Sequence, residues 1–153
     1  MITELQHVTG TDIVVRRALP TERGELAAMY RQFEPKADAL GLPPLREDDT
    51  ERWLDRLAQY PNFLAWSGQK VVGHAAICGD GDSAEVAVFV HQDYRERGIG
   101  RRLMNELIAE AQRMGMHRIW GIAAADNISM LRLAYSCGFI PGEEMGEFYR
   151  LLP

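Results

Sequence analysis

The stretch that decides the fold is RERGIG, Arg95 to Gly100, which follows the apolar run AEVAVFV and precedes the amphipathic pattern RRLMNELIAEAQRMG. Glycine weakens both a strand and a helix, so two glycines one residue apart indicate that something approaches the backbone closely. The first turn of a helix carries unpaired N–H groups and partial positive charge, which together bind anions. Positive charge is added by Arg95, Arg97, Arg101 and Arg102. We therefore predict a phosphate-binding turn here.

Three phosphate motifs compete for this turn. A Walker-type loop needs Lys and then Ser or Thr after its last glycine, whereas Gly100 is followed by two arginines. A dinucleotide-binding loop needs a third glycine at the position of Leu103. The remaining pattern, Arg-x-x-Gly-x-Gly after a strand, resembles the pyrophosphate-binding signature of the GNAT superfamily of N-acetyltransferases. The other interpretation is a helix start with incidental glycines.

The resemblance runs from about Ile13 to the C-terminus, and its specific part is 84–139. Within it, NISMLRLAYSCGF, from Asn127 to Phe139, resembles the second signature of the superfamily: an asparagine, a short helix and a Gly-Phe pair. The strand candidate HRIWGIAAAD lies between the two signatures. Because these features occur in the same order, the chain is identified as a member of the superfamily.

The resemblance implies an α+β GNAT fold. Its sheet would be mixed and mostly antiparallel, with helices on its faces and two splayed central parallel strands, here AEVAVFV and HRIWGIAAA. Acetyl-CoA, the co-substrate, would lie in the V between them. The implied coenzyme-binding residues are Val88, Phe89 and Val90 for the pantetheine arm, Arg95, Glu96, Arg97, Gly98, Ile99, Gly100 and Arg101 for the pyrophosphate, and Asn127 for the arm again.

Acetyl transfer requires a neutral amine, although a free lysine-type amine with a pKa of about 10.4 is almost wholly protonated at neutral pH. Glu85 is the candidate base, because a carboxylate in an apolar run is costly unless it is paired or used, and some members place a glutamate in this strand. The alternative is a partly exposed carboxylate at a strand end. His74 alternates with Val72 and Ala76 and is interpreted as packed or paired. A backbone N–H of Phe89 or Val90 would stabilise the oxyanion.

The chain lacks the tyrosine that many members of the superfamily place near the leaving CoA thiol. Many members have a tyrosine four residues before the Gly-Phe pair, where this chain has Ala134. Tyr135 is adjacent, but one residue turns a side chain by about 100° on a helix, so Tyr135 suits packing better than acid catalysis. A thiol with a pKa of about 8.5 leaves tolerably without help. The departure keeps open a second function, a CoA-binding sensor module without catalysis.

The acceptor is indicated by resemblance alone. MLRLAYSCGF resembles a subgroup that includes bacterial protein-lysine acetyltransferase domains, which implies a protein or peptide lysine or N-terminal amine as acceptor. A small polyamine or antibiotic-like amine is the second choice. The segment Glu34–Glu47 and the acidic turn GEEMGE would form the acceptor side, although an ordinary solvated loop explains that turn as well.

Composition bounds the remaining possibilities. A chain of 153 residues suits one domain over 1–153, with 1–12 as a poorly ordered lead. The net charge of −5 argues against a general nucleic-acid binder, and no apolar stretch is long enough for a membrane span. Cys78 and Cys137 lack metal-type spacing, so we expect no metal, reduced thiols and a cytoplasmic protein. Whether the chain is a monomer or a homodimer stays open.

The coarse pattern predicts the elements. We expect strands over 13–19, 62–66, 70–78, 84–90 and 117–125 and two short ones within 139–152. Helices are expected from a Thr21 cap, from an Asp48 or Asp49 cap, from the glycine turn to Gly115, and from Asp126 or Asn127 to Gly138.

Overall fold

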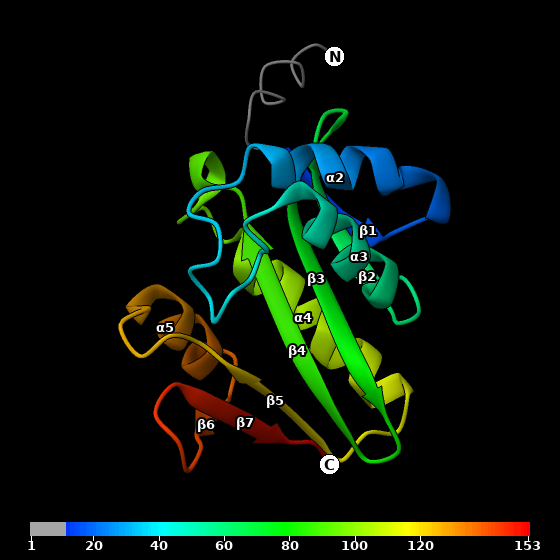
Figure 1. The fold of residues 1–153 in the computed structure, drawn as a ribbon. Coiled ribbons are helices and arrows are strands. Elements are labelled where there is room, and N and C mark those ends of the chain that lie inside the picture. Colours follow the sequence, from blue (N-terminus) through cyan, green and yellow to red (C-terminus); the bar gives the residue numbers. More distant parts are fainter. Residues whose placement is uncertain (1–11) are drawn as a thin grey trace.

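One seven-stranded sheet organises the chain, in the order β1-β2-β3-β4-β5-β7-β6 (Figure 1). The computed structural model describes residues 12–153, so the expectation of a poorly ordered lead over 1–12 lies outside the described residues except at its last position. The strands are β1 (Ile13–Arg17), β2 (Asn62–Ser67), β3 (Lys70–Asp80), β4 (Ser83–Val90), β5 (Arg118–Ile122), β6 (Ile140–Pro141) and β7 (Glu147–Leu151). Every neighbouring pair is antiparallel except β4 and β5. The predicted mixed, mostly antiparallel α+β sheet is confirmed.

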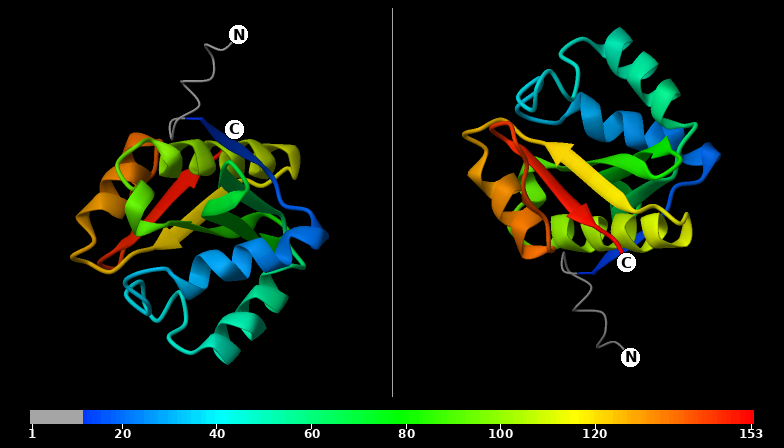
Figure 2. Two further views of the ribbon diagram at one scale, coloured as in Figure 1. Left: turned by 90° about the horizontal axis from the view of Figure 1, so that it is seen from above. Right: turned by 90° about the horizontal axis from the view of Figure 1, so that it is seen from below.

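Helices cover both faces of the sheet (Figure 2). One face carries α2 (Arg23–Arg31) and α3 (Glu47–Leu57), and the other carries α4 (Ile99–Arg113) and α5 (Ile128–Ser136). The short 3₁₀ helices are η1 (Pro20–Glu22) and η2 (Gln92–Tyr94). Each face has its own buried apolar cluster, because the side chains of a strand alternate between the two faces. Within residues 12–153, no helix is both long enough and apolar enough to cross a membrane.

The two central parallel strands separate along their length. The strands β4 and β5 pair only at their first residues, where Ser83 opposes Arg118 and Glu85 opposes Trp120. Beyond Glu85, β4 continues to Val90 without a partner on that side, and Figure 1 shows the two strands diverging. The splayed pair that the resemblance implied is therefore present.

Two helix starts differ from the sequence prediction. Thr21 does not cap α2: it lies inside η1, and the carboxylate of Glu22 accepts from the N–H of Leu19 at 2.8 Å. The helix α3 begins at Glu47, before either predicted aspartate cap, and Arg46 stands at its N-cap without a side-chain hydrogen bond. Asp48 and Asp49 instead lie in the first turn, where their charges complement the helix dipole.

The other helix ends follow the prediction. The side chain of Asn127 caps α5 by accepting from the N–H of Met130 at 3.1 Å. Gly115 after α4 and Gly138 after α5 both have positive φ, as expected for glycines that end helices. The strand β5 ends at Ile122, three residues earlier than predicted. The next residue, Ala123, donates instead to the Gly146 carbonyl in the turn between β6 and β7.

A buried polar chain joins α2 to the sheet. The amide of Asn62 donates to the carbonyls of Leu57 and Tyr60 at 2.7 and 2.8 Å, which leaves its oxygen as an acceptor for His74 Nε2 at 2.6 Å. The other ring nitrogen of His74 therefore accepts from the Tyr30 hydroxyl at 2.6 Å. Burial lowers the pKa of His74 to about 3. The expectation that His74 is packed or paired is confirmed, and its neutral form holds the chain of hydrogen bonds together.

His74 should make the fold acid-sensitive. The folded state keeps this imidazole neutral, so the unfolded state binds the proton more readily once the pH falls below about 6.5. We expect the free energy of unfolding to fall by up to about 1.4 kcal/mol per pH unit from there toward pH 3. Urea unfolding of the wild type and of His74→Gln at pH 7.5, 6 and 5 measures the difference.

Glutamine keeps one donor and one acceptor at this position but does not titrate. His74→Gln should be less stable than the wild type at pH 7.5. Because glutamine does not titrate, the variant should also lose less stability on acidification than the wild type. A residual slope is expected from groups such as His91, whose pKa burial also lowers. His117→Gln, at an exposed histidine, is the control and should keep the wild-type slope. Equal slopes for His74→Gln and the wild type would contradict the assignment.

Candidate functional site

The glycine turn leaves the N-terminus of α4 uncapped. Gly98 is the N-cap residue and has φ +82°, and no side chain caps the helix. The first helical bond runs from the N–H of Arg102 to the Gly98 carbonyl. Among the described residues, the N–H groups of Ile99, Gly100 and Arg101 have no hydrogen-bond acceptor. The start of α4 therefore has the uncapped amides that the sequence predicted for an anion-binding turn.

Glycine is required at positions 98 and 100 for two different structural reasons. A Cβ on Gly98 would meet no atom within 4 Å, so the space beside it is open, but its backbone conformation disfavours other residues. A Cβ on Gly100 would lie 2.9 Å from Cδ2 of Leu133 on α5. Gly100 thus allows α4 and α5 to pack closely, a role that the motif alone does not reveal.

The four arginines of the turn point to different partners. Arg95 donates to the carbonyls of Val90 and Glu34 at 2.8 and 3.0 Å. Arg97 stacks on Tyr94 at 5.1 Å. Of the other two, Arg101 lies 3.4 Å from the Ser136 carbonyl, and Arg102 donates to the Ile13 carbonyl at 2.7 Å. The predicted pyrophosphate contacts of Arg95, Arg97 and Arg101 stay predictions, and Nε and Nη2 of Arg95 have protein partners.

The unpaired edge of β4 presents the backbone of two valines. The N–H of His91 donates to the carbonyl of Val72 on β3, so the backbone of His91 faces β3. Because backbone groups alternate along a strand, Val88 and Val90 direct theirs toward the side where β5 has separated, and Phe89 directs its own toward β3. Of the two amides expected to face the reacting thioester, that of Val90 is thus the one at the open edge.

The side chain of Phe89 belongs to the acceptor-side core. Its ring lies 6.1 Å from those of Tyr30 and Phe33 and 5.4 Å from that of Trp53, all edge-on. Phe89 can therefore contribute to a coenzyme site through its backbone, while its ring fixes β4 against α2 and α3. Asn127 uses its oxygen as the cap of α5, which leaves its amide N–H groups without a partner among the described residues.

Glu85 lies at the point where β4 and β5 part. It is partly exposed, and it pairs in register with Cys78 on β3 and Trp120 on β5. It forms no ion pair within the described residues, and partial burial raises its pKa. The sequence analysis missed Trp120 as a neighbour of the candidate base; only the register of the parallel pair reveals it.

Tyr135 does not share the position of Ala134. Ala134 is fully buried on the inner face of α5, whereas Tyr135 is 42% exposed and its hydroxyl makes no hydrogen bond within residues 12–153. The predicted rotation between the two side chains is present, and Tyr135 is less packed than the sequence analysis expected. Its role as an acid stays a prediction.

The acidic turn between β6 and β7 has two kinds of carboxylate. Glu147 Oε1 accepts from the N–H of Glu143 at 3.1 Å, so Glu147 stabilises the turn from within. Glu143 and Glu144 are exposed, and Met145 between the strands is 83% exposed. Only Glu143 and Glu144 of the three thus remain available to a cationic acceptor.

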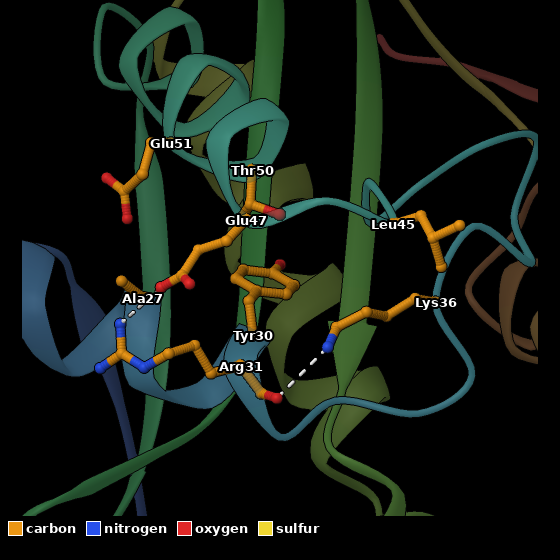
Figure 3. Close-up of a pocket in the computed structure, with 8 residues that line it drawn as sticks. All are labelled: Ala27, Tyr30, Arg31, Lys36, Leu45, Glu47, Thr50 and Glu51. Atoms are coloured by element: carbon orange, nitrogen blue, oxygen red, sulfur yellow. Dashed lines mark hydrogen bonds and ion pairs between the residues drawn. The ribbon is translucent and has the colours of Figure 1, made fainter.

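A pocket of about 270 Å³ lies between α2, α3 and the loop 32–46 that joins them (Figure 3). It contains none of the predicted coenzyme-binding or catalytic residues, but Lys36, Leu45 and Glu47 belong to the predicted acceptor segment Glu34–Glu47. Its charges have partners: Arg31 pairs with Glu47 at 3.5 Å, Lys36 donates to the Arg31 carbonyl, and Glu51 pairs with Arg23. We interpret the pocket as a gap between packed elements that is filled by charge pairs.

The fold places the uncapped start of α4 beside the point where two parallel strands diverge. The chain belongs to the acetyltransferase (GNAT) family, whose model matches residues 26–139. Members of this family are N-acetyltransferases that use acetyl-CoA, so the chain is an N-acetyltransferase.

Two curated relatives and one solved structure illustrate the similarity. The L-methionine sulfoximine/L-methionine sulfone acetyltransferase of Salmonella typhimurium is 28% identical over 61% of this chain and 67% of its own length. The L-amino acid N-acyltransferase of Escherichia coli is 32% identical over 64% of this chain and 62% of its own. The match therefore spans about two thirds of each relative. A Salmonella typhimurium protein solved with acetyl-CoA superposes with a TM-score of 0.72 at 22% identity, covering 93% of this chain and 95% of that one.

Proposed function

We propose that this chain transfers the acetyl group of acetyl-CoA directly to a primary amine, with Glu85 as the base. The observation that carries the proposal is the uncapped start of α4 beside the open edge of β4. The residues fit the coenzyme: open space beside Gly98 and three free amides suit a pyrophosphate. The backbone of Val88 and the N–H of Val90, whose carbonyl accepts from Arg95, suit an extended amide-bearing arm. The Asn127 amide would donate to the same arm. When bound, acetyl-CoA supplies an activated thioester.

Glu85 is suited to take the amine proton. Partial burial raises its pKa, which makes the carboxylate a stronger base than a solvated glutamate while it remains ionisable. The Val90 N–H would donate to the thioester oxygen, where negative charge develops. In the overall reaction the amine nitrogen bonds to the acetyl carbon, the carbon–sulfur bond breaks, and the amine proton passes to Glu85. The thiolate takes its proton from solvent.

Direct transfer is favoured over an acyl-enzyme. The cysteine nearest the base, Cys78, has its pKa raised to about 11 by burial and by the Glu85 carboxylate, so its thiol is protonated at neutral pH. The other, Cys137, is buried. Neither thiol is therefore suited to carry the acetyl group.

For the acceptor, we propose a small α-amino compound ahead of the protein or peptide lysine that the sequence favoured. Two relatives carry names that specify amino-acid acceptors. Release of free CoA thiol should be measured with L-methionine sulfone, L-methionine, spermidine and a blocked lysine peptide. Saturable release with an amino acid is expected. Turnover of the lysine peptide alone would restore the protein-directed alternative.

The position of Ala134 favours one other function. With Ala134 buried and Tyr135 exposed, α5 offers no hydroxyl at the position where many members carry their tyrosine. A CoA-binding sensor without catalysis would have such a site. CoA binding without amine-dependent thiol release across the panel would favour the sensor, and any amine-dependent release would exclude it.

A further inference from the structure

Two side chains from the turn after β4 bind the end of α2. The side-chain amide of Gln92 makes two hydrogen bonds there. Its nitrogen donates to the Gln32 carbonyl at 2.7 Å, and its oxygen accepts from the N–H of Glu34 at 2.8 Å. Arg95 Nη2 donates to the Glu34 carbonyl at 3.0 Å. Backbone groups beyond the end of a helix need such partners, because the helix itself no longer supplies them. We call these three hydrogen bonds the latch.

Arg95 also binds the strand. Its Nε donates to the Val90 carbonyl at 2.8 Å, and its guanidinium lies 5.2 Å from the ring of the buried Phe33. One planar group therefore bridges the end of β4 and the start of the segment 34–46. Burial lowers the pKa of Arg95, and the carboxylate of Asp38, from the same segment, opposes that shift. The guanidinium is well suited to this bridge because its fork holds two acceptors in a fixed geometry.

The latch lies between the two halves of the proposed site. Arg95 directly precedes the predicted pyrophosphate turn 96–101, and Gln92 begins η2 just before it, while Glu34 begins the segment expected on the acceptor side. A ligand that fixes the turn also fixes the Arg95 guanidinium. The position of Glu34, and with it the start of the segment, then depends on the state of the turn.

We propose that Gln92 and Arg95 are positioning residues that couple coenzyme binding at the turn 96–101 to ordering of the acceptor segment 34–46. This inference rests on the proposed function, because it assumes that CoA binds at the turn. Arg95 then acts through backbone carbonyls and has no direct contact with the pyrophosphate. Such coupling is reciprocal, and typical couplings change an affinity by about 5–150-fold.

Hydrogen exchange of the full chain with and without CoA tests the coupling. In the wild type, CoA should slow exchange both in 96–101 and in 34–46. In Arg95→Ala and Gln92→Ala, CoA should still protect 96–101, but the protection of 34–46 should be lost. Arg150→Ala is the matched control, since Arg150 on β7 also binds one backbone carbonyl, that of Cys137, outside both the latch and the turn. It should keep both responses.

Kinetics with the fastest amine of the acceptor panel adds a second readout. Both latch variants should raise the KM for the amine by about 5–150-fold, and because the coupling is reciprocal, both should change the CoA dissociation constant to the same extent. Loss of CoA affinity in Arg95→Ala with unchanged Gln92→Ala would make Arg95 a direct phosphate ligand and overturn the latch. Wild-type protein that binds CoA without any response in 34–46 would overturn it too, while leaving the proposed function intact. Wild-type protein that does not bind CoA would overturn both.

Discussion

Glu85→Gln should lower kcat by about 10²–10⁴-fold at pH 7, the usual contribution of a general base. Glutamine keeps the size and the hydrogen-bonding capacity of the side chain but cannot accept a proton. The affinity for acetyl-CoA should hardly change, because the uncapped amides of α4 lie on another element. Initial rates of thiol release and calorimetric titration with CoA measure the two quantities on the same protein.

The pH dependence of the activity shows whether Glu85 acts as a general base or only as a negative charge. The defect of Glu85→Gln should shrink as the pH rises toward the pKa of the amine, since more acceptor is then neutral without help. Wild-type activity should fall on acidification at a pH above the ordinary range of a glutamate, because burial raises the pKa of Glu85. Glu25→Gln, which removes an exposed carboxylate of α2 outside the predicted site, is the matched control and should change kcat little. A Glu85→Gln enzyme with full activity at pH 7 would assign the proton to a water relay or another carboxylate.

Much of the fold could be predicted from local patterns. The helix α4 was predictable because Leu103, Leu107 and Ala111 recur at helical spacing, and all three are fully buried. The cap at Asn127 was predictable because it stands directly before an apolar helical run. The start of α2 could not be predicted, because Thr21 is able to cap a helix but lies inside η1, and α2 begins only at Arg23. A preference for capping does not specify which residue caps when several polar residues are adjacent.

The candidate site, too, could be predicted only where it rests on neighbouring residues in the sequence. Its phosphate turn is contiguous in sequence, so a motif could predict it, and the backbone geometry at Gly98 fits that prediction. The packing role of Gly100 could not be predicted, because it depends on Leu133 from another helix. The latch was equally hidden, since Glu34 and Gln92 are 58 residues apart and meet only when α2 packs on the sheet. Contacts between distant residues that follow from packing leave no periodic signal in the sequence.

Gly98→Val is expected to weaken CoA binding by at least about 100-fold. A β-branched residue cannot readily hold the φ of +82°, so the turn should shift and its free amides should lose their alignment. Hydrogen bonds to a charged group contribute about 1.5–3 kcal/mol each, and the loss of two corresponds to roughly two to four powers of ten in affinity. Calorimetric titration with CoA gives the affinity, and thermal unfolding gives the accompanying loss of stability.

Gly115→Val separates the binding effect from the cost of backbone strain. Gly115 follows the other end of the same helix, has φ +74°, and a Cβ there would also meet no atom within 4 Å. Both variants should therefore lose about 1–2 kcal/mol of stability through the left-handed conformation. Only Gly98→Val should lose CoA, because the unpaired N–H groups and the positive end of the dipole are at its end of α4. Equal CoA affinities in the two variants would remove the start of α4 from the coenzyme site.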